Sequence, residues 1–379
     1  MKFRSLFLSA ICGLAVSAAF TSCSDDDEYD PFAGGSKVAI PENVGYILNQ
    51  GSSGKNNANI VCFDWKADTL NVDPNTEHDL FYLQNGKRLG DTAQDMIMYN
   101  GNLYVVVYGS SYVAKLNRAG VEQTRKQIPS EYGQPRYAVA EDGAIYVTCI
   151  GGYIVKLSAD DLSELGKVKV GHTPEHIDEN DGILYVAQGS SYDGKESDNR
   201  IAIVNTNNFT DAAVKYVDVM PNTQVVVAND NYVAVQGYGY DWTNTPFWIY
   251  DIKSGKAIDT GECCTYVTKV EGSNKFFCVY AKTDWSTYET HNTYFYYDPA
   301  TQSKEDITSK VGSNDETLLS CTVFGLSTGK DGSYYILNSF YSSGNGRVFH
   351  ETDNFQRQQV YTSWGQNPCK VVLDKECSP

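Results

Sequence analysis

Histidines are the side chains in this sequence best suited to catalytic or metal chemistry, and they are few. The chain contains His78, His172, His176, His291 and His350. His172 and His176 stand on either side of Pro174, so they do not form the one-turn pair of a helical zinc site. No serine-nucleophile elbow, phosphate-binding loop or dinucleotide fingerprint occurs. We therefore expect no enzyme activity, no resident metal and no cofactor. His172 is kept as a candidate polar contact to a ligand.

Aromatic side chains are the more informative set. They make up 13% of the chain, with 28 Tyr and 5 Trp, and many fall in polar, loop-like segments. The longest such insertions cover residues 74–91, 189–199, 237–246 and 281–292. Tyr and Trp offer a large rigid contact area and a hydrogen-bonding tip. Rings gathered in loops therefore favour the binding of a large ligand.

A repeated unit supplies the strands that would hold these loops. Six times, a tight turn of Asn, Asp, Ser and Gly precedes a β-rich strand, and such residues tolerate the positive φ of hairpin turns. Equivalent positions recur every 39 to 58 residues, at Leu103, Ile145, Leu184, Val233, Phe276 and Tyr334. That is the period of propeller blades with insertions. The sequence predicts an all-β, seven-bladed β-propeller of four-stranded blades over residues 44–379.

The seventh blade is split between the two ends of the propeller. Residues 368–374 resemble an innermost strand with nothing after it, while residues 44–49 and 60–64 resemble a second and a third strand with no first. Pairing the two ends would complete the ring and remove an exposed sheet edge. We expect the N- and C-terminal strands to close the last blade.

The two faces of the predicted ring differ in aromatic content. Loops from second to third and from fourth to first strands share one face, here the long-loop face. The remaining turns share the other, here the turn face. The turn face holds Trp65, Tyr99, Phe209 and Phe355, whereas the long-loop face also carries Phe81 and Tyr82. We predict ligand contacts on the long-loop face, from Tyr112, Tyr132, Tyr153, His172, Tyr192, Tyr238, Tyr240, Trp242, Trp285, Tyr288, Phe340, Tyr341 and Trp364. About half of these rings are expected only to pack loops together.

The first 22 residues have the pattern of an export signal. Lys2 and Arg4 precede an uncharged run over residues 6–20, which is shorter than the 18–20 residues of a bilayer span. The run ends at Ser22-Cys23 and is followed by four acidic residues after Ser24. This resembles a bacterial lipoprotein signal with Cys23 as the lipidated residue, followed by an acidic tether over residues 23–43. Plain secretion, with Cys23 an ordinary thiol, is the alternative.

Net charge and cysteine spacing limit the classes of partner and of metal site that the chain is expected to have. A net charge of −17 disfavours nucleic acid and anionic lipid surfaces as partners, so contact with a membrane is expected through the lipid anchor only. No two cysteines have the C-x-x-C spacing of a zinc site. The pairing of the remaining cysteines is open: Cys62, Cys149, Cys263, Cys264, Cys278, Cys321, Cys369 and Cys377.

The repeats resemble those of a known family. Strands of the LYV type and strand starts such as Gly133-Gln134-Pro135 are similar to the YncE-like (YVTN) seven-bladed propellers, over residues 44–374. Joined to the lipidation signal and its acidic run, the chain resembles the BtuG-like surface lipoproteins of gut Bacteroidetes. That resemblance implies capture of cobalamin on the outer-membrane surface and its transfer to a TonB-dependent transporter. It implies lipidation of Cys23 and a ligand face, without individual contact residues.

Two other classes remain open at this point. A propeller that binds a siderophore, a glycan or a protein would use the same face. A lyase-type propeller enzyme would place a His/Glu pair at the mouth of the channel and turn over a substrate.

Overall fold

The computed structural model describes residues 30, 32–67, 77–191, 198–238, 244–284, 286–287, 289–329, 331–340 and 344–374. The chain divides into two units, Met1–Asp30 and Pro31–Pro379, and the fold below is that of the second. Within the described residues, no helix combines the length and hydropathy needed to cross a bilayer.

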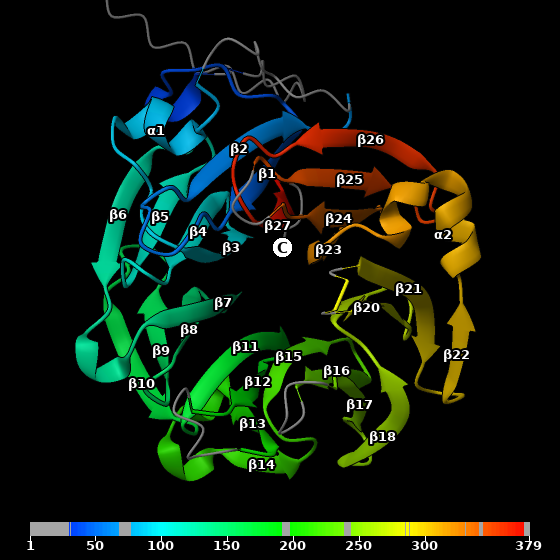
Figure 1. The fold of residues 1–379 in the computed structure, drawn as a ribbon. Helices are drawn as coiled ribbons and strands as arrows, with labels where there is room; N and C mark the ends of the chain where they lie inside the picture. The colour runs from blue at the N-terminus through cyan, green and yellow to red at the C-terminus, as the bar shows by residue number, and fades with distance from the viewer. Residues whose placement is uncertain are drawn as a thin grey trace, which may run out of the picture. The chain divides into compact units, whose positions relative to one another are not determined.

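Residues of the second unit form seven antiparallel sheets arranged as blades around a ring (Figure 1). Blade 1 contains β3 (Ala93–Tyr99), β4 (Asn102–Val107), β5 (Tyr112–Asn117) and β6 (Glu122–Gln127). Blade 2 contains β7 (Pro135–Glu141), β8 (Ala144–Cys149), β9 (Tyr153–Ser158) and β10 (Glu164–Lys169). Blade 3 contains β11 (Thr173–Asn180), β12 (Ile183–Gly189), β13 (Arg200–Asn205) and β14 (Lys215–Asp218).

The second half of the ring follows the same order. Blade 4 contains β15 (Thr223–Ala228), β16 (Tyr232–Gly237), β17 (Pro246–Asp251) and β18 (Lys256–Cys263). Blade 5 contains β19 (Tyr266–Lys269), β20 (Phe276–Asp284), β21 (Glu289–Asp298) and β22 (Ser303–Asp306). Blade 6 contains β23 (Val323–Thr328), β24 (Tyr334–Asn338), β25 (Arg347–Glu351) and β26 (Arg357–Thr362). The predicted propeller is confirmed.

Blade 7 joins the two ends of the propeller, as the split repeat predicts. Its described strands are β27 (Pro368–Leu373), β1 (Val44–Asn49) and β2 (Asn59–Asp64), in that order from the centre. β27 pairs antiparallel with β1, with Tyr46 opposite Val372 and Ile47 opposite Val371. The residues after β2, 68–76, lie outside the described part of the chain. The ring is therefore closed by hydrogen bonds between its first and last strands.

The burial of the strands explains why their positions could be predicted from the sequence. Second strands such as β8 and β24 are buried along their whole length because each blade is covered by its neighbours. Outer strands such as β22 are exposed at every position and are polar. Hydrophobic clusters fill the spaces between adjacent blades, as between blades 1 and 2. The inner strands contact one another around the ring in the order β3, β7, β11, β15, β19, β23 and β27.

Short helices and one extended hairpin occupy the insertions. Helix α1 (Leu80–Asn85) begins at Asp79, whose side chain accepts from the Tyr82 amide, and α2 (Thr308–Asn314) follows blade 5. The single turns are η1 (Ala33–Gly35), η2 (Ser130–Tyr132), η3 (Thr206–Asn208), η4 (Asp211–Ala213) and η5 (Glu316–Leu319). The expectation that 281–292 is a loop was wrong for most of its length. β20 and β21 continue pairing there, with Lys282 opposite His291, because the β-formers Thr283 and Thr290 stand opposite each other and their hydroxyls are hydrogen-bonded at 3.1 Å.

Residues 34–43, part of the predicted tether, lie against the propeller and are here called the strap. Ile40 is buried in the core cluster shared by blades 7 and 1, and Val38 packs on the same cluster. The Asn117 side chain donates to the carbonyl of Gly34 (3.2 Å). The strap is thus part of the packed fold.

Candidate functional site

A channel along the axis of the ring is the central cavity of the propeller. It has a volume of about 470 Å³ and is lined by residues of all seven inner strands. Each inner strand begins on the long-loop face, because the loop from the preceding fourth strand leads into it. The first residues of the inner strands therefore form the mouth of the channel on that face.

β-bulges shape this mouth. Near its first residues, each of β3, β7, β11, β15, β23 and β27 carries one residue more than its partner strand. The residues at these bulges are Gln94, Arg136 and Tyr137, Glu175 and His176, Gln224, Phe324, and Cys369. A bulge breaks the alternation of a strand and re-aims the extra side chain. With the exception of Glu175, these side chains line the channel.

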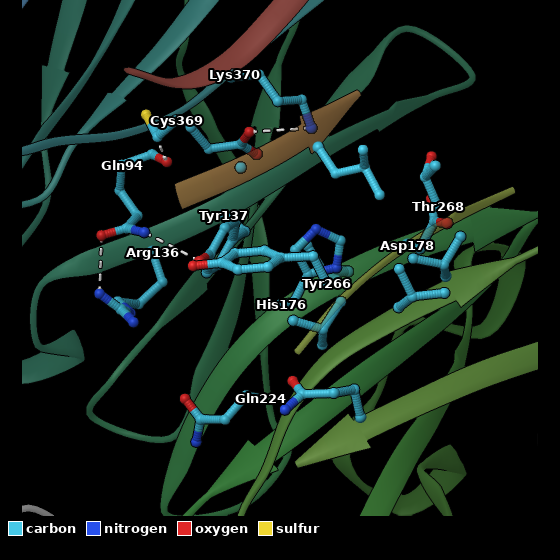
Figure 2. A pocket seen from close by; sticks show the side chains of 18 of the residues that line it. Gln94, Arg136, Tyr137, His176, Asp178, Gln224, Tyr266, Thr268, Cys369 and Lys370 are labelled. Atoms are coloured by element: carbon cyan, nitrogen blue, oxygen red, sulfur yellow. Dashed lines mark hydrogen bonds and ion pairs between the residues drawn. The ribbon is translucent and has the colours of Figure 1, made fainter. Parts of the chain in front are cut away.

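Four of the polar side chains form a connected group, here called the polar arc: Gln50, Gln94, Arg136 and Glu175. The Gln94 Oε1 atom accepts hydrogen bonds from Gln50 Nε2 (3.2 Å) and from Arg136 Nη1 (3.0 Å). Arg136 Nε donates to Glu175 Oε2 at 2.7 Å. The Gln94 amide also donates to the Tyr137 hydroxyl (3.0 Å), as Figure 2 shows. These bonds hold the polar arc in one geometry before any ligand binds.

The charges at the mouth are balanced in pairs. Burial raises the pKa of the Glu175 carboxyl, and the adjacent Arg136 guanidinium opposes that rise. A second pair joins Lys370 on β27 to Asp95 on β3, with Nζ and Oδ1 3.4 Å apart. Asp95 also accepts from the Ala138 amide (3.0 Å). The pairing suits a ligand that is polar but carries little net charge.

An imidazole and a phenol lie together inside the channel. The rings of His176 and Tyr137 have centroids 4.7 Å apart, and both side chains are visible in Figure 2. Burial lowers the pKa of His176, and the Lys370 ammonium lowers it further, so the imidazole is neutral at physiological pH. Within the described residues, its Nδ1 atom has no hydrogen-bond partner. Burial raises the pKa of Tyr137 to about 12, so its phenol keeps its proton.

The opposite side of the mouth is more apolar. Tyr266 on β19 and Phe324 on β23 line the channel there. Gln224 on β15 and Gln236 on β16 lie between this side and the polar arc, and Gln224 Nε2 donates to the side chain of Asn222 (2.9 Å). The mouth therefore offers carboxamides along one side and rings along the other.

Three predicted contact residues make contacts within the protein. Tyr112 is buried, and its hydroxyl donates to the carbonyl of Leu89. The Tyr132 hydroxyl donates to Glu164 at 3.0 Å and accepts from Lys167 at 2.9 Å. Tyr153 packs against Tyr132, with ring centroids 5.4 Å apart. None of the three lines the channel.

The other described candidates differ in position. Tyr238 lines the channel. His172 is exposed and does not line it. Phe340 is exposed beside Arg347, whose guanidinium lies 5.5 Å from the ring centre. Trp364 is half-buried and packs on His78, with ring centroids 4.0 Å apart.

Some predicted positions lie outside the described residues. These are Tyr192, Tyr240, Trp242, Trp285, Tyr288 and Tyr341, together with the lipidation residue Cys23 and the last cysteine, Cys377. Their proposed roles stay predictions. The seven described cysteines are free thiols. In the part of the chain that is described, no three His, Cys, Asp or Glu side chains cluster as a metal site would require.

The polar arc was missed at the sequence level. Its signal is weak: Gln94 and Arg136 each stand second in an inner strand, after Ala and Pro. Under strict alternation such a position is indistinguishable from a residue that faces the next blade. Only the β-bulge directs the side chain at that position toward the channel.

Comparison with known proteins supports the fold and identifies no family to which the chain belongs. No family model and no curated protein matches the chain. Among solved structures, it resembles a quinoprotein alcohol dehydrogenase-like protein from Bacteroides thetaiotaomicron (TM-score 0.59, 12% identity, 87% of this chain and 78% of that one). It also resembles a proposed 6-phosphogluconolactonase from Bacteroides fragilis (TM-score 0.59, 9% identity, 87% and 98%). A third is hydrazine synthase of Kuenenia stuttgartiensis (TM-score 0.54, 14% identity, 67% and 75%). At these identities the likeness concerns the β-propeller fold alone.

Proposed function

We propose that this chain is a lipid-anchored protein of the outer-membrane surface that captures cobalamin at the channel mouth and passes it to a TonB-dependent transporter. The polar arc is the observation from which we infer the class of ligand. Its carboxamides, with those of Gln224 and Gln236, offer both donors and acceptors at the mouth. Cobalamin has a broad corrin ring that is apolar on its faces and rimmed by amides, and such a rim is matched by carboxamide side chains.

Size and charge also support a large, weakly charged ligand. A channel of about 470 Å³ accommodates part of such a molecule, with the remainder on the aromatic loops of the long-loop face. Because Arg136 is paired with Glu175 and Lys370 with Asp95, the mouth does not select an anion by net charge. Affinity should therefore vary little between low and high salt.

Isothermal titration with cyanocobalamin tests the proposal. We expect heat of binding, and a rise in melting temperature at saturating ligand. No heat and no thermal shift would refute cobalamin as the ligand and favour a siderophore, a glycan or a protein, for which the same titration serves.

A variant within the polar arc tests the site. Gln94→Leu keeps the size of the side chain and removes its bonds to Gln50, Arg136 and Tyr137, so affinity should fall about tenfold. Gln123→Leu, at an exposed position on β6 of the same blade, should leave affinity unchanged. Equal affinities of the two variants for cyanocobalamin would contradict a binding site at the channel mouth.

An enzyme is the second candidate, because His176 is a neutral imidazole inside the channel. The arrangement differs from a His/Glu catalytic pair, since the neighbouring Glu175 carboxylate binds Arg136. Mass spectrometry of ligand recovered from the complex separates the two functions. Unchanged ligand supports capture, and modified ligand that disappears with His176→Ala supports catalysis.

A further inference from the structure

A second cavity of the propeller lies on its turn face, between blades 6 and 7, and is here called the interblade cleft. It has a volume of about 380 Å³, and among the described residues it shares none with the lining of the axial channel. The turns from β23 to β24 and from β25 to β26 line it from blade 6, and the residues just after β2 line it from blade 7. Figure 1 shows these two blades side by side. The interblade cleft is therefore separate from the channel mouth, which lies on the opposite face.

An indole ring provides the apolar part of the interblade cleft. Trp65, the first residue after β2, is half-buried and packs against the hydrophobic cluster that blades 6 and 7 share. Lys66 is exposed, and its Nζ atom lies 5.5 Å from the centre of the indole ring. Such an exposed cation–π contact is weak, so a ligand can replace it. Among the described residues, Trp65 Nε1 has no hydrogen-bond acceptor, so the chain itself leaves this donor unsatisfied.

The turns of blade 6 provide two carboxylates. Asp331, between β23 and β24, and Asp353, between β25 and β26, are both exposed. The Ser333 amide and hydroxyl donate to Asp331 Oδ1 (3.0 and 2.5 Å), and Asn354 Nδ2 donates to Asp353 Oδ1 (3.0 Å). These bonds orient each carboxylate through one oxygen only. The second oxygen of each therefore remains for a donor from a ligand.

The rest of the lining is polar and uncharged. Thr352 and the exposed Gln358 supply a hydroxyl and a carboxamide, which both donate and accept hydrogen bonds. The buried His350 ring also lines the interblade cleft and is stacked on the Tyr335 ring, with centroids 4.5 Å apart. Stacking of this kind holds one wall in place before a ligand arrives.

We propose that the interblade cleft binds a neutral saccharide. A pyranose ring carries C–H groups on its faces, which pack on an indole such as Trp65. Its hydroxyl groups donate to carboxylates such as Asp331 and Asp353, and accept from the Trp65 Nε1 donor and from the Lys66 ammonium. A cavity of about 380 Å³ is within the ~300–1,000 Å³ range of small-molecule pockets. This site is independent of cobalamin capture, because a saccharide bound on the turn face leaves the channel mouth open.

Charge separates a saccharide from other polar ligands. The interblade cleft has two carboxylates and one ammonium in its described lining, so an acidic sugar or another anion is disfavoured. A basic peptide would pair with Asp331 and Asp353 but would be repelled by Lys66 and would leave the Trp65 donor unsatisfied. A ligand with many hydroxyl groups satisfies all four residues at once.

Saturation-transfer NMR with four methyl glycosides tests the proposal, using those of glucose, galactose, mannose and N-acetylglucosamine. We expect saturation transfer to the ring protons of at least one glycoside, with a Kd that varies little between low and high salt. Transfer to none of the four would overturn the proposal. Tetralysine is measured in the same way, and binding of this peptide in place of every glycoside would assign the interblade cleft to a basic partner.

Two variants locate the saccharide. Trp65→Ala removes the indole and Asp331→Asn removes one carboxylate, so the Kd for the glycoside should rise about tenfold in each. Asp331→Asn changes an exposed side chain and keeps the oxygen that accepts from Ser333, so its result does not depend on a damaged fold. Asp142→Asn alters the exposed aspartate of the equivalent turn in blade 2 and should leave the Kd unchanged. A Kd that is unchanged in both Trp65→Ala and Asp331→Asn would show that the glycoside binds elsewhere, and would overturn the proposal while leaving cobalamin capture untouched.

Discussion

The guanidinium of Arg118 binds the carboxylate of Asp374, the residue that follows the closing strand β27. The two residues belong to blade 1 and blade 7, and the same guanidinium donates to the strap at Pro41. The Tyr46 hydroxyl on β1 in turn donates to the Arg118 carbonyl. Through its side chain and its carbonyl, this one residue ties the first strand, the last strand and the strap to the neighbouring blade.

Loss of this guanidinium should weaken the closed ring. We expect Arg118→Ala to lower the free energy of unfolding by about 1–3 kcal/mol, because charge-assisted hydrogen bonds at a partly buried position are removed. Urea unfolding with an unchanged slope measures this. Arg125→Ala removes the ion pair with Glu122 inside blade 1 and is the control, with an expected change below about 1 kcal/mol. A control as damaging as Arg118→Ala would contradict a special role in closure.

Strand order and ring closure could be predicted from the sequence. The turn residues mark each hairpin, and one strand at each end of the propeller is left without a partner. Asp142-Gly143 and Asp181-Gly182 adopt the positive φ that their residue types favour, and the strands after them are buried, apart from the half-buried Ile183 that begins β12. Residues 368–374 lacked a partner in sequence order, which left β1 as the remaining edge. The hairpins depend on neighbouring residues alone, and closure follows because one strand at each end is left without a partner.

The polar arc could not be predicted, because it depends on a displacement of backbone rather than on a residue pattern. Arg136 follows Pro135 at the start of β7, and only the bulge against β8 decides that it lines the channel. The strap was missed for a similar reason. Ile40 ends the run Val38-Ala39-Ile40, which is too short to show a period, and the turn that binds the adjacent Pro41 lies 77 residues later, at Arg118.

The anchor proposal makes a direct prediction about Cys23. Cys23→Ala should release the protein from membranes, because the acyl chains that hold it would have no thiol to join. Fractionation followed by immunoblotting measures the distribution. Cys12→Ala, inside the apolar run, should leave the protein membrane-bound. Membrane-bound Cys23→Ala protein that is still accessible to external protease would exclude lipidation at this residue.

The aromatic loops make a prediction about affinity. Trp242→Ala and Trp285→Ala should each weaken cyanocobalamin binding about 30-fold, since central Trp side chains commonly contribute about 2 kcal/mol or more. Trp364→Ala should weaken binding similarly and also lower stability, because the ring packs on His78. Trp65→Ala, on the turn face, should leave affinity unchanged. Tight binding by all three long-loop variants would keep cobalamin as ligand and remove these rings from the site.

A buried acid between blades 5 and 6 makes a prediction about pH. Glu351, at the end of β25, is 0% exposed, and neither of its carboxylate oxygens has a hydrogen-bond partner among the described residues. Burial raises the pKa of Glu351 from 4.5 to about 8. The Asp315 carboxylate before η5 adds to the rise, and the Arg357 guanidinium on β26 opposes it. The buried Tyr294 phenol faces the same carboxyl from β21.

Because the folded pKa of Glu351 is the higher one, the folded protein holds a proton that the unfolded chain has lost. The free energy of unfolding should therefore fall as pH rises from about 4.5 to about 8, by at most about 1.4 kcal/mol per pH unit. Glu351→Gln keeps the shape and removes the titration, so this part of the pH dependence should vanish and the variant should be the more stable at pH 8. Urea unfolding at half-unit steps measures both proteins. Glu131→Gln, at an exposed position, should follow the parent. Parallel curves for the parent and Glu351→Gln would show that Glu351 is already ionised in the folded state.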